Sequence, residues 1–145
     1  MELLSKSEYA LLALLELADH YPSGEPLQIR QIAALQNIPK RYLEQLLTAL
    51  RQGGLIRSIR GAKGGYVLSR DPRQITILEA LGCVEGLDPA TSVKNKTSKT
   101  AESQVIQEIW LEAFEASNSV LQKYTLQDLC ERRTARQAIG LMYYI

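Results

Sequence analysis

Residues 27–52 carry the feature that most constrains the fold: two short amphipathic helices joined by a tight turn. The turn, at residues 36–39, ends the first helix because Pro39 restricts the residue before it and Asn37 tolerates a left-handed backbone. The apolar residues of the second helix recur with helical spacing: Tyr42, Leu43, Leu46, Leu47 and Leu50. This pattern predicts a helix-turn-helix, whose second helix can enter the major groove of DNA.

A basic hairpin is predicted directly after these helices. Strands at residues 55–60 and 66–69 flank a glycine-rich turn at residues 61–65. The glycines allow the backbone of this turn to approach a duplex closely. The order of elements therefore predicts a mainly α-helical fold with a small β-wing, a winged helix-turn-helix. In such a fold the hairpin reaches phosphates or the minor groove beside the recognition helix.

Basic residues are concentrated in this part of the chain. Residues 40–73 contain eight lysines and arginines but two acidic residues, a local charge of +6, whereas the whole chain carries a formal net charge of +1. Charge segregation of this kind is typical of a surface that faces phosphates. A solvated basic surface is the alternative interpretation of the charge alone, and the helix-turn-helix pattern favours DNA.

The candidate DNA contacts follow from this placement. Glu44 and Gln45 are suited to reading base edges, because a carboxylate accepts from cytosine N4 and an amide pairs with adenine. Arg51 and Arg57 are suited to binding phosphate. The full set of predicted DNA-binding residues is Gln28, Lys40, Arg41, Tyr42, Glu44, Gln45, Arg51, Arg57, Arg60, Lys63 and Gly64.

A long apolar pattern follows the wing. We assign residues 1–85 to the DNA-binding domain, 86–101 to a flexible loop, 102–124 to a long helix and 125–145 to a short helix and tail. A helix of ~20 residues is ~30 Å long, which exceeds what the winged domain can cover. Its broad apolar face is therefore predicted to form a two-fold dimer interface, with folding back onto its own domain as the alternative. The predicted dimerisation residues are Val105, Ile106, Ile109, Trp110, Ala113, Phe114, Val120 and Leu121.

The sequence offers no pattern for catalysis. It has no glycine-rich phosphate loop between a strand and a helix, no convincing pair of carboxylates and no Ser–His or Cys–His arrangement. No apolar run approaches the ~20 residues that cross a membrane. The N-terminus begins an amphipathic helix and lacks the layout of a signal peptide. We therefore expect a cytoplasmic, non-enzymatic protein without a membrane partner.

Three segments resemble a known protein family. Residues 5–11, SKSEYAL, resemble the opening of the Rrf-two family of bacterial winged-helix regulators. Residues 42–47, YLEQLL, and residues 58–66, SIRGAKGGY, resemble its recognition helix and wing. The resemblance covers nearly the whole chain. It implies a dimeric transcription factor that binds pseudo-palindromic operators in double-stranded DNA, with the long helix as the dimer interface.

The chain departs from the cluster-binding members of this family. Those members place three cysteines in the loop before the long helix, whereas residues 86–100 contain neither cysteine nor histidine. Cys83 is expected to be a small buried residue. Cations beside Cys130 would lower its pKa and make it oxidisable, although a structural role is favoured. No metal or cofactor is therefore expected. The alternative is an unconventional iron–sulfur cluster held by Cys83 and Glu8 across the dimer, although such clusters normally need several thiolates.

The end of the chain carries a second resemblance. Residues 142–145, MYYI, resemble the C-terminus of the family's cysteine-metabolism repressors and that of serine acetyltransferase, which inserts its terminal isoleucine into cysteine synthase. Backbone N–H groups can capture a free carboxylate while an isoleucine side chain fills an apolar slot. Tyr143, Tyr144 and Ile145 are thus candidate contacts to cysteine synthase. The alternative is a tail that packs on its own domain.

The preferred hypothesis is a dimeric, sequence-specific DNA-binding transcriptional regulator that responds to sulfur or cysteine status through its C-terminal tail. Two alternatives stay open. One is a redox-sensing regulator with an unconventional iron–sulfur cluster, and the other is a winged-helix adaptor used for protein contacts.

Overall fold

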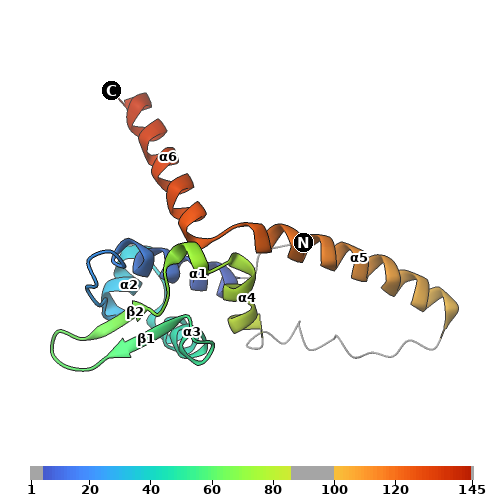
Figure 1. The fold of residues 1–145 in the computed structure, drawn as a ribbon, viewed down its shortest axis with the longest axis horizontal. Coiled ribbons are helices and arrows are strands. Elements are labelled where there is room, and N and C mark those ends of the chain that lie inside the picture. The colour runs from blue at the N-terminus through green and yellow to red at the C-terminus, as the bar shows by residue number, and fades with distance from the viewer. Residues whose placement is uncertain (1–4, 86–99, 145) are drawn as a thin grey trace.

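The computed structural model describes residues 5–85 and 100–144. This part of the chain is mainly helical with a small two-stranded sheet, as predicted (Figure 1). The predicted loop at residues 86–101 lies outside the described residues, apart from its last two positions. The elements are α1 (Ser5–Asp19), α2 (Ile29–Gln36), α3 (Lys40–Gln52), β1 (Ile56–Ile59), β2 (Gly65–Leu68), the 3-10 helix η1 (Pro72–Gln74), α4 (Ile77–Glu85), α5 (Ala101–Lys123) and α6 (Leu126–Tyr144).

The turn between α2 and α3 has the predicted chemistry. Asn37 adopts a left-handed backbone with φ of 52°, and the N–H of Ile38 donates to the carbonyl of Ala33. Pro39 precedes the first residue of α3 with φ of −58°, close to the value that its ring imposes. Ile38 is buried between the two helices. The turn therefore fixes the angle at which α3 leaves α2.

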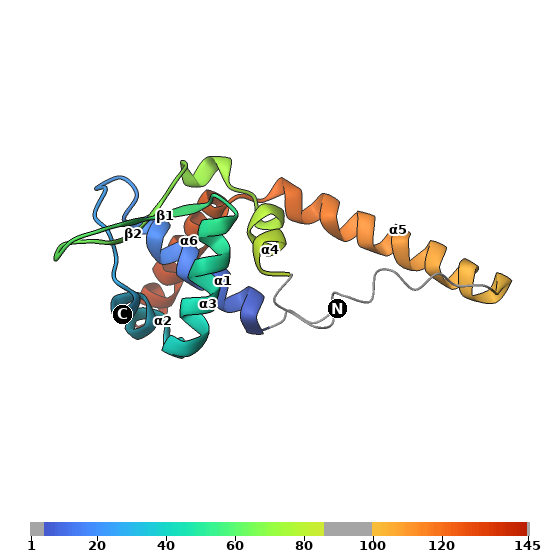
Figure 2. The ribbon, with the colours of Figure 1, turned by 90° about the horizontal axis from the view of Figure 1, so that it is seen from below.

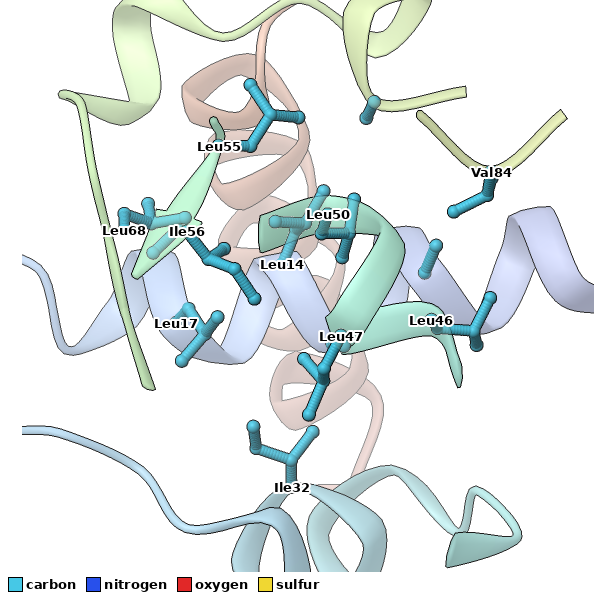
Figure 3. Close-up of a cluster of buried hydrophobic side chains, with 14 of the residues drawn as sticks. Leu14, Leu17, Ile32, Leu46, Leu47, Leu50, Leu55, Ile56, Leu68 and Val84 are labelled. Carbon is cyan, nitrogen blue, oxygen red and sulfur yellow. The ribbon is translucent and has the colours of Figure 1, made fainter. Parts of the chain in front are cut away.

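The hydrophobic core is centred on α1, which packs against α2, α3, α4, α6 and β2. Figure 3 shows Leu14 and Leu17 of α1 surrounded by Leu47 and Leu50 of α3 and by Ile56 of β1. A helix that is apolar around most of its circumference needs neighbours on several sides, and α1 has them. One face of α3 is thereby buried, which leaves its opposite face exposed.

Two hydrogen bonds tie the junction of α5 and α6 to the start of α4. The N–H of Ile77 donates to the carbonyl of Tyr124 over 2.9 Å, and the N–H of Leu126 donates to the carbonyl of Ile75 over 2.9 Å. The Leu126 side chain is fully buried in the core. The winged domain therefore contains the first residue of α6 as well as residues before α5.

Helix α5 projects away from the rest of the molecule in both views (Figures 1 and 2). None of its residues is buried. The alternative expectation, a helix folded back onto its own domain, is therefore wrong for the chain as a single copy. Among the described residues, no helix has the length and apolar character that crossing a bilayer requires.

Helix α6 is longer than predicted. It runs for 19 residues from Leu126 to Tyr144, where the sequence had suggested a short helix followed by a tail. The physical reason is that no proline follows Pro89 and the segment is rich in good helix formers, so nothing stops the helix once it has begun. Ile145 and the side chains of Tyr143 and Tyr144 lie outside the described residues.

Candidate nucleic-acid interface

Helix α3 has one apolar face and one polar face. Leu43, Leu46, Leu47 and Leu50 are buried, whereas Lys40, Arg41, Glu44, Gln45 and Arg51 are exposed. Tyr42 is 45% exposed, so its assignment to the apolar face was wrong. Tyr42 is in the first turn of α3, at the edge of the buried face and not at its centre. The exposed ring stays among the candidate DNA contacts that the sequence analysis had already named.

The wing is an antiparallel pairing of β1 and β2, with Ile56 opposite Leu68 and Ile59 opposite Gly65. Its turn needs two glycines for steric reasons. A Cβ on Gly64 would lie 2.1 Å from the carbonyl oxygen of Ile59. A Cβ on Gly65, where φ is +154°, would lie 2.4 Å from the carbonyl oxygen of Leu27. The wing backbone therefore packs without side chains where it meets the start of the helix-turn-helix.

Two backbone hydrogen bonds hold the wing to the residue that precedes α2. The N–H of Leu27 donates to the carbonyl of Tyr66 over 3.0 Å, and the N–H of Tyr66 donates to the carbonyl of Leu27 over 2.8 Å. Gln28 follows directly, and its N–H donates to Oε1 of Gln31 over 2.8 Å at the first turn of α2. The start of α2 and the base of the wing are thus held side by side.

A groove of about 390 Å³ lies between α2, α3 and the wing. It brings together four residues that the sequence had predicted, Gln28, Lys40, Glu44 and Gly64, although they are far apart in the chain. We call it the wing groove. Its lining residues are Gln28, Ile29, Arg30, Lys40, Glu44, Ile59, Gly61, Gly64 and Gly65.

Three side chains of the wing groove were absent from the predicted DNA contacts: Ile29, Arg30 and Ile59. Arg30 is exposed in the first turn of α2, and Ile59 is 36% exposed at the end of β1. Strand alternation was the signal for Ile59, because it lies three residues after the buried Ile56 and therefore points to the other face of the sheet. Arg30 was detectable as a basic residue two positions after Gln28.

The other predicted DNA contacts are exposed but do not line the wing groove. Arg51 lies near the far end of α3, 11 residues and about 16 Å along the helix from Lys40. Arg57 is exposed in β1. The remaining members of this set are exposed on α3 or in the loop between β1 and β2: Arg41, Tyr42, Gln45, Arg60 and Lys63.

Two of the eight basic residues between positions 40 and 73 are paired with carboxylates. Arg70 contacts Glu79 over 2.5 Å, and Arg73 contacts Asp71 over 2.9 Å. The hydrogen bond from the Arg73 side chain, followed by the one from its backbone N–H, lowers the pKa of Asp71. Arg70 and Arg73 are therefore less available to phosphates than the basic residues of α3 and the wing.

The two cysteines do not form a cluster site of the usual kind. Cys83 is on α4 and Cys130 on α6, and burial is the main cause that raises the pKa of each thiol. The expectation that neighbouring cations lower the pKa of Cys130 is wrong, because burial outweighs the effect of Arg133. Within residues 5–85 and 100–144, no three His, Cys, Asp or Glu side chains lie close enough to hold a metal ion.

Iron–sulfur clusters need several thiolates. The donors present near Cys83 and Glu8 do not fit such a group, and no step proposed below uses one.

Helix α5 carries a broad apolar face that is exposed along its length. Trp110 is 76% exposed and Ile109 is 62% exposed. Leu111, which the sequence analysis left out, is exposed as well. The predicted dimerisation residues all lie on α5, and only Leu121 among them is partly covered. An apolar surface of this extent marks an interaction site in most proteins of this size.

Comparisons of the sequence and of the structure with known proteins all match transcriptional regulators. The sequence model of the family Rrf2, described as "Iron-dependent Transcriptional regulator", matches residues 3–132. The regulator CymR of Bacillus subtilis is 35% identical over 146 residues, which cover the full length of both chains. Its solved structure, described as the global cysteine regulator, has a TM-score of 0.74 and covers 91% of this chain and 98% of that one. A structure of T. potens IscR has a TM-score of 0.77 at 34% identity, covering 99% and 97%.

Proposed function

This chain belongs to the Rrf2 family of transcriptional regulators, and on that premise we propose that it binds pseudo-palindromic operators as a homodimer. Its relatives are DNA-binding regulators and not enzymes. In our proposal, α3 enters the major groove while the wing lies beside it on the same duplex. The observation that carries this proposal is the exposed basic surface of α3 and the wing, which meet at the wing groove.

The roles of the residues follow from their positions. Lys40 and Arg41, in the first turn of α3, bind phosphates, and Gln28 adds a contact at the start of α2. Glu44 and Gln45 face base edges from the exposed side of α3. Tyr42, Arg51, Arg57, Lys63 and the backbone of Gly64 complete the contact surface. Arg60, directly after β1, reaches a phosphate or the minor groove.

Dimerisation is supported by α5. A 23-residue helix without a buried residue is not stable as a free element in water, because most helical stability in proteins comes from packing of an apolar face. A second copy of the same helix supplies the missing contacts through a two-fold axis. The two winged domains then read the two halves of the operator.

Arg60→Ala tests the DNA contact. An operator is first selected from a random duplex library with the wild-type protein, and fluorescence anisotropy then gives the dissociation constant over a series of salt concentrations. We expect weaker binding. We also expect the slope of the logarithm of the binding constant against the logarithm of the salt concentration to fall in magnitude by about 1, because one phosphate contact is lost. Arg136→Ala, at an exposed position on α6, is the matched control and should change neither quantity.

Two results would contradict the proposal. Wild-type protein that binds no duplex in a salt-dependent manner would make the winged domain a protein adaptor. Arg60→Ala with the same affinity and slope as Arg136→Ala would remove Arg60 from the contact surface.

The finer part of the proposal concerns the cellular signal that would control DNA binding. A relative that is similar over its whole length is described as a global cysteine regulator, and this chain has the residues MYYI at positions 142–145. We propose that Tyr143, Tyr144 and Ile145 bind cysteine synthase. The precursor O-acetylserine would compete for the same pocket, so DNA binding would depend on sulfur status.

Removal of residues 143–145 tests this signal. Wild-type protein mixed with purified cysteine synthase should elute with the enzyme in gel filtration, and O-acetylserine should separate the two. The shortened chain should elute alone while keeping its affinity for DNA. Co-elution of the shortened chain with the enzyme would contradict the proposed role of the tail.

A further inference from the structure

We propose that the wing groove receives one sugar–phosphate strand of the bound duplex, with Arg30 against a phosphate and Ile59 against the neighbouring deoxyribose. This inference rests on the proposed DNA binding and deepens it. It adds two contact residues, and it assigns each of them to a different chemical part of the DNA backbone.

The position of the groove supports this occupant. One wall is the first half of α3, which lies in the major groove, and the other wall is the wing, which reaches the adjacent minor groove. In duplex DNA these two grooves are separated by a single sugar–phosphate strand. A protein that places one element in each groove must therefore leave space for that strand between them, and the wing groove is located there.

The charges of the lining support an anionic occupant. Among the nine lining residues, the charged ones are Arg30, Lys40 and Glu44. Lys40 and Glu44 are four residues apart on the same helix, a spacing at which opposite charges offset each other. Arg30 therefore makes the net charge of the lining positive. Without it the lining residues would carry no net charge, and a phosphate in the groove would lose the cation of the lining that no carboxylate of the lining offsets.

The apolar part of the lining fits the sugar. The Ile59 side chain is 36% exposed within a groove whose other wing residues are Gly61, Gly64 and Gly65. An exposed isoleucine gains little beside a phosphate, but it buries apolar surface against the carbon face of a deoxyribose. Because every nucleotide has this sugar, the contact adds affinity without sequence preference.

The groove is preformed. Gly64 and Gly65 are packed against backbone atoms of Ile59 and Leu27, where no Cβ fits. The reciprocal hydrogen bonds between Leu27 and Tyr66 join the wing to the start of α2. The wall that carries Ile59 is thus fixed relative to the wall that carries Arg30, so little ordering is needed when the strand binds.

The test compares four variants on two duplexes, the selected operator and a random sequence, by anisotropy over a salt series. Arg30→Gln should weaken binding to both duplexes and reduce the salt slope by about 1, whereas Arg30→Lys should keep the slope. Ile59→Ser should weaken binding to both duplexes by the same factor without changing the slope, and Ile59→Val should bind as wild type. Circular dichroism melting verifies that all four are folded.

The outcomes separate this inference from the proposed function. If wild-type protein binds DNA with strong salt dependence but Arg30→Gln and Ile59→Ser are unchanged, the wing groove is not a strand site although the protein is a DNA binder. If the loss for Ile59→Ser is confined to the operator, Ile59 reads a base and the sugar assignment is wrong. If wild-type protein binds neither duplex, the proposed function itself fails.

Discussion

Gly53 and Cys83 meet where the end of α3 packs on α4. Gly53 has an ordinary right-handed backbone, with φ of −77°, so a glycine is not needed there for its conformational freedom. It is needed for space, because a Cβ would lie 2.3 Å from Sγ of Cys83. The thiol therefore fills the position that a side chain at residue 53 would take, and this contact sets how closely the recognition helix approaches α4.

Gly53→Ala should lower the free energy of unfolding by about 1–3 kcal/mol, the usual range for overpacking a well-packed contact. In a Cys83→Ala background the same substitution should cost less, because the sulfur is gone. Urea unfolding of the four proteins in this cycle measures the coupling. Gly82→Ala is the control: it has no neighbour within 4 Å of the added Cβ and should stabilise α4 by about 0.5–1 kcal/mol. Strictly additive effects of the two substitutions would disprove the contact.

Glu44 is the acidic residue of the wing groove, and its charge opposes phosphate binding. Glu44→Gln should therefore change the preferred base sequence more than the affinity for random DNA, since a carboxylate and an amide read different base edges. Repeating the selection from a random duplex library with the variant measures this preference. Glu25→Gln, at an exposed loop position, should select the wild-type operator. Equal losses on operator and random DNA would make Glu44 a structural residue.

At the scale of elements, local chemistry explains where most helices begin. The N–H of Glu79 donates to Oγ1 of Thr76 over 3.1 Å and so caps the start of α4. Thr125 and Asp128 form a reciprocal cap before and within α6, with N–H to oxygen distances of 2.9 and 3.2 Å. These bonds join residues three positions apart, a spacing that can be recognised in the sequence.

Thr125→Ala should lower the free energy of unfolding by about 1 kcal/mol, because the N–H of Asp128 loses its acceptor. Thr134→Ala is a matched control on the same helix. Its hydroxyl donates to the carbonyl of Cys130 in the helix interior, where alanine is the better helix former. Chemical denaturation at a fixed protein concentration should therefore show a loss for the first variant and no loss for the second. The same loss in both would argue against the cap.

At the scale of the whole molecule, the proposed dimer depends on α5, which would hold two DNA-binding surfaces together. Ile109→Glu places a charge in the centre of its apolar face, and a buried unpaired charge costs several kcal/mol. Sedimentation equilibrium should show a shift towards monomer, and affinity for the operator should fall because each half-site is then bound separately. Gln122→Glu adds the same charge at an exposed polar position of α5 and should leave the dimer intact. A monomeric wild-type protein would refute the role of α5.

The sequence by itself determined the local features, which depend on neighbours a few residues away. These features are the left-handed turn at Asn37, the caps at Thr76 and Thr125, the apolar face of α3 and the glycine-rich wing. Such features are set by backbone preferences and by side chains within one helical turn. The fold class could be predicted from them, together with the α3 and wing residues of the candidate interface.

What only the tertiary structure decided is which distant residues share a surface. Arg30 and Ile59 belong with Lys40 and Glu44 because the backbone hydrogen bonds between Leu27 and Tyr66 bring α2 and the wing together. The same applies to Leu126, which follows the long helix but is buried in the winged core. Contacts between residues far apart in the chain depend on how whole elements pack, and hydrophobic periodicity shows that a face is buried but not which partner covers it.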